Sequence, residues 1–333
     1  MNVARLAALF VCAAGAAGAA LSASGEDGAR SGAVRLASRQ EGLRLRAPDL
    51  SRPISEKMPD PSRPADPVKA AVLRRINEDR GRSGLPPVAW DETASRAADG
   101  FCARQVEEKS RGHFLMDGIP PYGRMSFAGI FAMNAENSAS WVTTGSRFSE
   151  SIVSLALDAQ ESMMQERPPA DGHRRTILDP RATHVGVGYF LNHGRFQMAQ
   201  EFLTRRFEHI TLAAAGRPSA GLTVSGKAVP GERIRFVTVA REPVPRALSR
   251  EQASGRTSYS YPDPYLALVP EGQTLLRVVG MPTEDRLRVT PGREFSFFFV
   301  PDRPGLYTFS LYLLGGGGGD RPYPAAAATV WVE

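Results

Sequence analysis

One carboxylate and one imidazole lie close together in this sequence, on either side of a turn that prolines make rigid. Glu166 closes a segment with helical character, and Pro168 stops that helix because proline cannot donate the N–H that a helix needs. Asp171 and Gly172 then make a turn, and His173 opens the short apolar segment that follows. A glutamate and a histidine fixed at opposite ends of a rigid turn have the geometry from which functional sites are built.

A buried strand is predicted directly after this turn. Residues 183–192 are mostly apolar, and Gly186 and Gly188 mark positions where backbone or a ligand must approach closely. A second strand is expected over residues 195–204. Residues 192–194 are Asn-His-Gly, which tolerate positive φ, so we expect them to join the two strands in a hairpin.

Three helices are expected before this hairpin. Asp66, followed by proline, is a typical start of the first helix, because its carboxylate accepts bonds from free N–H groups. Asp91 is expected to cap the second helix, over residues 92–109, and the third covers residues 149–166. The Phe- and Met-rich residues 125–133 are interpreted as core, although such segments can also adapt to apolar ligands.

The region after about residue 210 has a different pattern. Residues 233–239 and 306–311 alternate between apolar and polar types with period two, and Pro-Gly turns separate such runs. We predict an all-β, immunoglobulin-like sandwich over residues 211–333 and no helix there. The glycine run at residues 315–319 is not a phosphate-binding loop, because no Lys-Ser/Thr pair or helix follows it.

The N-terminus has the features of an export signal. Residues 1–23 contain Arg5, an apolar run and small residues at their end, so they are predicted to be a signal peptide, with the mature protein secreted to the periplasm or the exterior. Residues 24–65 are rich in proline and arginine and are predicted to be a linker, within which residues 43–46 could add an edge strand. No membrane-spanning segment is expected once the signal has been removed.

Cysteine and charge exclude several classes of function. Cleavage of the signal removes Cys12 and leaves Cys102, so we expect a monomer without internal disulfides and a buried thiol in the second helix. The net charge is +6, but positive and negative side chains are interspersed without a polybasic block. Nucleic-acid binding is therefore not predicted.

Several short motifs occur in the order typical of one family. They are Ile76 to Arg80, Gly84 to Asp91, Gly112-His113, Glu136-Asn137, Met163 to Glu166, Gly172-His173-Arg174 and Thr183 to Gly188. Together they resemble the CAP superfamily, the bacterial, SCP-like relatives of cysteine-rich secretory proteins, antigen 5 and pathogenesis-related 1 proteins. The resemblance covers residues 66–208. It implies an α+β fold, a three-layer α-β-α sandwich with a central antiparallel sheet.

The resemblance also implies an open cleft with a tetrad of two histidines and two glutamates from neighbouring loops: His113, Glu136, Glu166 and His173. Two departures from the family pattern affect the shape of this cleft, since Ala135 replaces the usual glycine and Met163 the usual tryptophan. Two neutral imidazoles, His113 and His173, form a partial site for Zn²⁺ or another divalent metal, which water or a carboxylate could complete. Alternatively, the four side chains satisfy one another by hydrogen bonds and lock the loops onto the sheet.

Three functions remain open on this basis. The first is a secreted, non-enzymatic binding module with a metal-capable cleft that holds a small apolar ligand, such as a lipid, or an envelope-derived ligand. The second is a metal-assisted hydrolase with Glu136 or Glu166 as catalytic base, although neither H-E-x-x-H nor G-x-S-x-G occurs. The third is an envelope adhesion or scaffold protein that acts through the β-sandwich. Outside the tetrad, His184 is interpreted as a packed histidine, and His193 and His209 as solvated ones.

Overall fold

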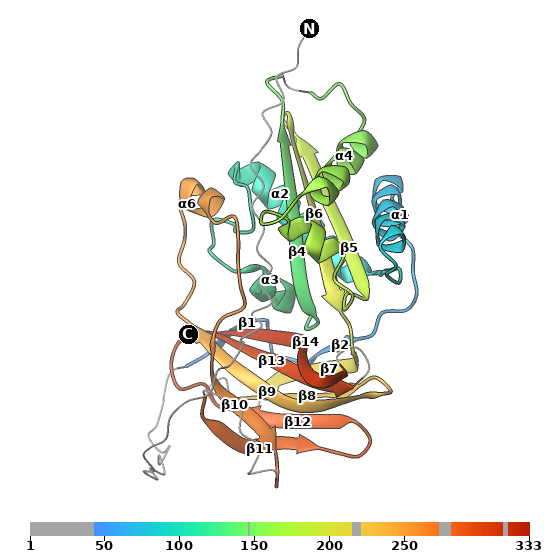
Figure 1. The fold of residues 1–333 in the computed structure, drawn as a ribbon. Helices are drawn as coiled ribbons and strands as arrows, with labels where there is room; N and C mark the ends of the chain where they lie inside the picture. Colours follow the sequence, from blue (N-terminus) through green and yellow to red (C-terminus); the bar gives the residue numbers. More distant parts are fainter. Residues whose placement is uncertain (1–42, 146, 215–220, 273–280, 316–318) are drawn as a thin grey trace.

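The computed structural model describes residues 43–145, 147–214, 221–272, 281–315 and 319–333. The predicted signal peptide and residues 24–42 of the predicted linker lie outside these ranges. The described chain forms a four-stranded sheet flanked by helices, next to a ten-stranded sheet (Figure 1). No helix within the described ranges is long and apolar enough to cross a membrane.

The four-stranded sheet has the order β3-β5-β6-β4. Its strands are β3 (Ala89–Trp90), β4 (Met133–Val142), β5 (His184–Asn192) and β6 (Arg195–Thr204). The predicted hairpin is present: His193 and Gly194 join β5 to β6 with φ angles of 48° and 67°. The sheet is antiparallel except that the short β3 pairs in parallel with β5.

Helices cover both faces of this sheet. The elements are α1 (Pro67–Arg82), α2 (Glu92–Glu108), α3 (Pro121–Phe127), α4 (Ile152–Gln165) and α5 (Gly172–Ile177). Asp66 and Asp91 cap α1 and α2, as predicted, by accepting bonds from backbone N–H groups of the first turn. Successive side chains of a strand point to opposite faces of the sheet. Val185 and Val187 of β5 therefore pack into the core under α1 and α4, whereas Ala199 of β6 packs against α2 on the other face.

The glycines of β5 allow α2 to lie directly on the sheet. A Cβ at Gly186 would overlap the backbone of Ser95, and a Cβ at Gly188 would overlap the backbone of Ala98. The predicted close approach is therefore made by a helix backbone.

The ten-stranded sheet has the order β1-β14-β13-β9-β10-β11-β12-β8-β7-β2. Its strands are β1 (Leu45–Ala47), β2 (Ile54–Lys57), β7 (Phe207–Ala214), β8 (Leu222–Ala228), β9 (Glu232–Glu242), β10 (Pro264–Pro270), β11 (Thr283–Val289), β12 (Glu294–Phe299), β13 (Gly305–Gly315) and β14 (Gly319–Val332). The rings of Phe297 on β12 and Phe309 on β13 are 5.5 Å apart, although these strands are distant in the sheet order. The sheet therefore folds over on itself around one apolar core.

Two local expectations differ from the structure. The prediction of no helix after residue 210 is wrong, because α6 (Arg250–Gly255) forms behind a capping box of Ser249 and Gln252. Within the segment predicted to be a linker, β1 pairs with β14 and β2 pairs with β7. β1 overlaps the edge strand expected at residues 43–46, whereas β2 is too short for a periodic signal and is specified by its long-range pairing.

A buried ion network joins the two sheets. Arg205, which follows β6, donates to Asp91 at the start of α2 over 2.6 Å and to Glu56 on β2 over 2.5 Å. The second oxygen of Glu56 accepts the backbone N–H of Phe131 over 2.8 Å. All three charged side chains are buried or nearly so, so each charge depends on its partners.

Candidate functional site

The four tetrad residues form two histidine–glutamate pairs. Nδ1 of His113 lies 2.8 Å from Oε1 of Glu136, and Nδ1 of His173 is hydrogen-bonded to Oε1 of Glu166. Two of these residues lie in regular elements and not in loops: Glu136 is in β4 and His173 is in α5. The strand and the helix fix the backbone of one residue in each pair, so each pair is more rigid than one built from two loop residues.

Arg124 of α3 completes the first pair. Its guanidinium contacts Oε2 of Glu136 over 2.5 Å and donates to the backbone carbonyl of His113 over 2.8 Å. His113 is 2% exposed and Glu136 is 1% exposed. Burial, assisted by the positive charge of Arg124, lowers the pKa of His113 to about 4, so the imidazole is neutral at pH 7. Burial raises the pKa of the Glu136 carboxyl, and Arg124 opposes that shift.

A third buried glutamate, Glu201, lies beside this pair. The β4–β6 register places it directly opposite Glu136, with which it shares a hydrogen bond. Burial and the nearby charge of Glu136 raise the pKa of Glu201 well above its ordinary value. The proton therefore lies on Glu201, whose carboxyl group donates a hydrogen bond to Glu136. Sequence reasoning missed this residue, although a carboxylate inside an otherwise buried strand was the available signal.

The second pair is built at the junction of α4 and α5. Glu166 is the C-cap residue of α4, and its Oε2 accepts the backbone N–H of His173 over 3.0 Å. The side chain of Asn137 donates to the carbonyl of His173 over 3.2 Å. Glu136 and Asn137 are consecutive residues of β4, so this edge strand anchors both pairs.

The residues offer two imidazoles to a metal. Among the residues that the structure describes, no three His, Cys, Asp or Glu side chains converge as ligands of one ion. Each Nδ1 is oriented by a carboxylate, as in metal sites where the other ring nitrogen, Nε2, coordinates the ion. Two nitrogens are fewer than the three protein ligands of catalytic zinc sites or the four of structural ones, so the set fits only a weakly held, largely hydrated ion.

Aromatic residues from the β9–β10 segment (residues 243–263) cover the first pair. Tyr259 packs edge-on against His113 with ring centroids 5.1 Å apart. Its hydroxyl accepts the N–H of Glu136 over 2.7 Å, and the hydroxyl of Tyr261 accepts the N–H of Asn134 over 3.1 Å. β4 is an edge strand, so the two tyrosines bond outward-facing donors that lack a strand partner.

The cleft is consequently closed over His113. The resemblance predicts an open cleft, but the region after β9 contributes a cover that short-range sequence patterns do not reveal. The backbone carbonyl of Arg256 lies 3.5 Å from the N–H of His113, and the N–H of Leu248 bonds to the carbonyl of Met116 over 2.8 Å. At Gly118, whose φ is +73°, a Cβ would overlap the carbonyl of Arg246. The segment and the loop after α2 are therefore fitted to each other.

Comparison with known proteins identifies the domain that holds both pairs. Residues 73–202 match the family model described as "CAP: Cysteine-rich secretory protein family". The chain contains a CAP domain. A curated relative, the uncharacterized protein YkwD of Bacillus subtilis (strain 168), is 28% identical over 119 residues. That match spans 35% of this chain and only 40% of the relative.

Solved structures with similarity to this chain cover less than half of it. An extracellular protein containing an SCP domain from Bacillus anthracis str. Ames is 20% identical, with a TM-score of 0.33 over 43% of this chain and 45% of that one. An outer surface protein from Borrelia burgdorferi is 15% identical, with a TM-score of 0.35 over 43% of this chain and 96% of that one. The region outside the CAP domain lies beyond the family match.

Motif residues of the CAP domain outside the tetrad have structural roles. The side chain of Asn77 bonds both the N–H and the carbonyl of Val88. The buried guanidinium of Arg80 donates to four backbone carbonyls, those of Pro86, Ile177, Asp179 and Ala182. These contacts fix the ends of β3 and α5, and with α5 the position of His173.

The remaining candidates are packed or peripheral. Cys102 is buried in α2, and burial raises the pKa of its thiol well above the usual range, so it is unreactive at neutral pH. Burial and Arg205 lower the pKa of His184 to about 4. His193 is exposed in the hairpin turn, and His209 is half-buried on β7. Of the apolar segment after residue 120, Met125, Ile130 and Phe131 are core residues.

Proposed function

We propose that this is a non-enzymatic binding protein of the cell exterior whose CAP domain holds a divalent metal ion, Zn²⁺, at His113 and His173. The observation that carries the proposal is the bond from Nδ1 of each imidazole to a carboxylate. Such a bond fixes the tautomer and orients the ring for coordination through Nε2. The low pKa of His113 keeps its imidazole neutral at pH 7, the form that binds a metal.

The exterior location is supported by two features. Residues 1–23 have the charge and apolar pattern of an export signal. The domain itself belongs to a family described as secretory. The free cysteine of the described chain, Cys102, is buried. An oxidising exterior is therefore compatible with this thiol, because it has no second cysteine within reach to form a disulfide.

The geometry favours binding over hydrolysis. A general base must come within hydrogen-bond reach of the proton that it removes. Glu136 already accepts bonds from His113 and Arg124, it is bonded to Glu201, and Tyr259 covers its surroundings. Glu166 accepts bonds from both the ring and the backbone of His173. Both carboxylates thus act as orienting groups and not as bases.

We further infer that the ten-stranded sheet is an immunoglobulin-like sandwich that positions the CAP domain. Its two halves enclose one core, and the Arg205 network ties it to the start of α2. The apolar segment that suggested a lipid site is core, with Met125 and Ile130 each 1% exposed, so lipid binding forms no part of this proposal.

Titration calorimetry with ZnCl₂ at pH 7 tests the metal site. We expect the wild type to bind zinc weakly, and the double variant His113→Ala/His173→Ala to lose at least about tenfold in affinity. His193→Ala, which removes an exposed imidazole from the β5–β6 turn, is the matched control and should bind as the wild type does.

The same proteins separate binding from catalysis. Zinc binding that survives in the double variant would remove the metal site from the proposal. Cleavage of fluorogenic peptides or esters by the wild type, lost in the double variant and retained in His193→Ala, would overturn the non-enzymatic assignment.

A further inference from the structure

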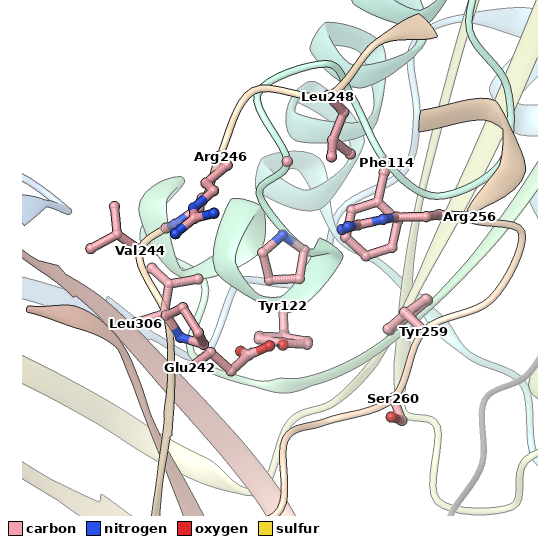
Figure 2. A pocket seen from close by; sticks show the side chains of 14 residues that line it. Phe114, Tyr122, Glu242, Val244, Arg246, Leu248, Arg256, Tyr259, Ser260 and Leu306 are labelled. Carbon is pink, nitrogen blue, oxygen red and sulfur yellow. Dashed lines mark hydrogen bonds between the residues drawn. The ribbon is translucent and has the colours of Figure 1, made fainter. Parts of the chain in front are cut away.

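A cavity of about 500 Å³ lies where the β9–β10 segment crosses α3 and the loop before it (Figure 2). One wall is formed by residues of the CAP domain, and the other by residues that follow β9. The apolar part of the lining includes Phe114, Pro120, Tyr122, Pro243, Val244 and Leu248. A volume of this size suits a small organic molecule, since ligand pockets commonly occupy about 300–1,000 Å³.

The cavity is fixed by the contacts that hold its walls. The N–H of Leu248 bonds to the carbonyl of Met116 over 2.8 Å, and the close fit at Gly118 positions the backbone of Arg246. The hydroxyl of Tyr122 donates to Glu242 over 2.5 Å, which joins α3 to the end of β9. A cavity with walls held in this way is largely formed before a ligand arrives, which reduces the cost of binding.

Two arginines make the lining positive. Arg246 and Arg256 lie at opposite sides of the cavity in Figure 2. The guanidinium of Arg256 lies 5.1 Å from the ring centroid of Phe114. Neither arginine forms an ion pair with a carboxylate of the described residues.

The acidic residue of the lining, Glu242, forms no ion pair with either arginine among the residues that the structure describes. Burial raises the pKa of Glu242, and its carboxyl group is bonded to the hydroxyl of Tyr122. Arginines without a carboxylate partner beside apolar walls match a ligand that carries its own anionic group.

We propose that this cavity binds a small organic anion, with a carboxylate or phosphate group between Arg246 and Arg256 and a compact apolar body against Phe114 and Val244. Guanidinium groups bond both kinds of anion through paired N–H donors, and the apolar walls supply burial for the body. The site is separate from the histidine pairs, because no residue of either pair lines the cavity. Tyr259 lines it and also packs against His113. It requires neither metal nor catalysis in the CAP domain.

Calorimetry on the full chain with three probes of one shape tests the site: 1-naphthoate, 1-naphthyl phosphate and the uncharged 1-naphthalenemethanol. We expect at least one anion to bind about tenfold or more tightly than the alcohol, because only the anions use the arginines. The better of the two anions identifies the head group as carboxylate or phosphate.

Matched variants assign the binding to these residues. Arg246→Gln/Arg256→Gln should weaken anion binding by about tenfold or more and leave the alcohol unchanged. Arg250→Gln/Arg288→Gln removes the same charge from two exposed arginines outside the cavity and should bind as the wild type does. Val244→Trp, which fills the cavity, should abolish binding of all three probes.

The proposal fails if none of the probes binds the wild type, if the two double variants bind the anions equally, or if Val244→Trp still binds them. Should the melting temperature of Arg246→Gln/Arg256→Gln be lowered, the single variant Arg246→Gln gives the decision, since this exposed side chain has no ion-pair partner in the described chain. Loss of anion affinity in that variant supports the site, and unchanged affinity overturns it.

Discussion

Glu201 gives the buried first pair its charge balance. Its proton allows two glutamates to lie opposite each other between strands, where two ionised carboxylates would repel. Arg124 then neutralises Glu136, and His113 stays uncharged because burial lowers its pKa to about 4. One positive and one negative charge remain, so the buried pair carries no net charge.

This protonation state predicts how Glu201→Gln responds to pH. The pKa of Glu201 is raised on folding, so its contribution to stability is fully present below the unfolded value and is lost as pH rises through the folded value. Glutamine is neutral at every pH and keeps a donor for Glu136. We expect its free energy of unfolding, relative to the wild type, to be higher at pH 8 than at pH 5 by on the order of 1 kcal/mol.

Urea denaturation of both proteins at the two pH values measures this difference. His113 titrates in both proteins and cancels in the comparison. Glu107→Gln, on the exposed side of α2, serves as control and should show the same pH dependence as the wild type. A pH-independent difference between Glu201→Gln and the wild type would contradict a proton on Glu201.

At the scale of elements, the sheet of the CAP domain depends on the distance between α2 and β5. Gly186 and Gly188 face the backbone of α2, where a Cβ has no space. The side chain of Ser95 donates to the carbonyl of Val187 over 2.7 Å, and the thiol of Cys102 contacts the carbonyl of Gly188 at 3.5 Å. Side chains of α2 therefore reach backbone carbonyls of β5 directly. This contact requires the short distance between helix and strand that the two glycines allow.

Gly188→Ala should push α2 away from the sheet. Because the Cβ would meet backbone and not a movable side chain, we expect a loss of about 1–3 kcal/mol or more in the free energy of unfolding. Gly100→Ala is the matched control: Gly100 lies on the exposed side of α2 with open space around its Cβ position. Alanine should stabilise the helix there by up to about 1 kcal/mol. Chemical denaturation that ranks the two variants in the reverse order would refute the close-approach argument.

At the scale of the whole molecule, the two sheets share charged and backbone contacts. Arg205 bridges Asp91, the residue between β3 and α2, and Glu56 on β2 of the ten-stranded sheet. It lies 114 residues from Asp91 and 149 residues from Glu56 in sequence. The N–H of Ala327 in β14 bonds to the carbonyl of Phe131 over 2.8 Å, close to β4. The CAP domain therefore contacts both ends of the remaining chain, through β2 and through β14.

Arg205→Ala should destabilise this junction strongly. The substitution leaves the buried carboxylates of Glu56 and Asp91 without their cation, and breaking a buried ion pair in this way costs about 3–5 kcal/mol. Arg288→Ala removes an exposed arginine paired with Glu271 and should change stability by less than about 1 kcal/mol. Thermal and urea unfolding compare the two variants. Equal stability of both would mean that the junction contributes little to the fold.

Local chemistry in the sequence determined much of the CAP domain. Asp66 and Asp91 begin α1 and α2 because a carboxylate caps free N–H groups wherever a helix starts. His193 and Gly194 form the hairpin turn because both tolerate positive φ. The tetrad could be named from the order of short motifs, since each motif is carried by adjacent residues.

Tertiary structure decided what surrounds those residues. The partnership of Glu201 with Glu136 depends on strand register, and Tyr259 reaches the backbone of Glu136 across 123 residues of sequence. Glu56 lies in a segment too polar and short to suggest a strand. Pairing of β2 with β7 and the bond from Arg205 fix its position. Periodicity and capping report on neighbours within a few residues, whereas the closed cleft, the proton on Glu201 and the anion cavity arise from contacts between distant segments.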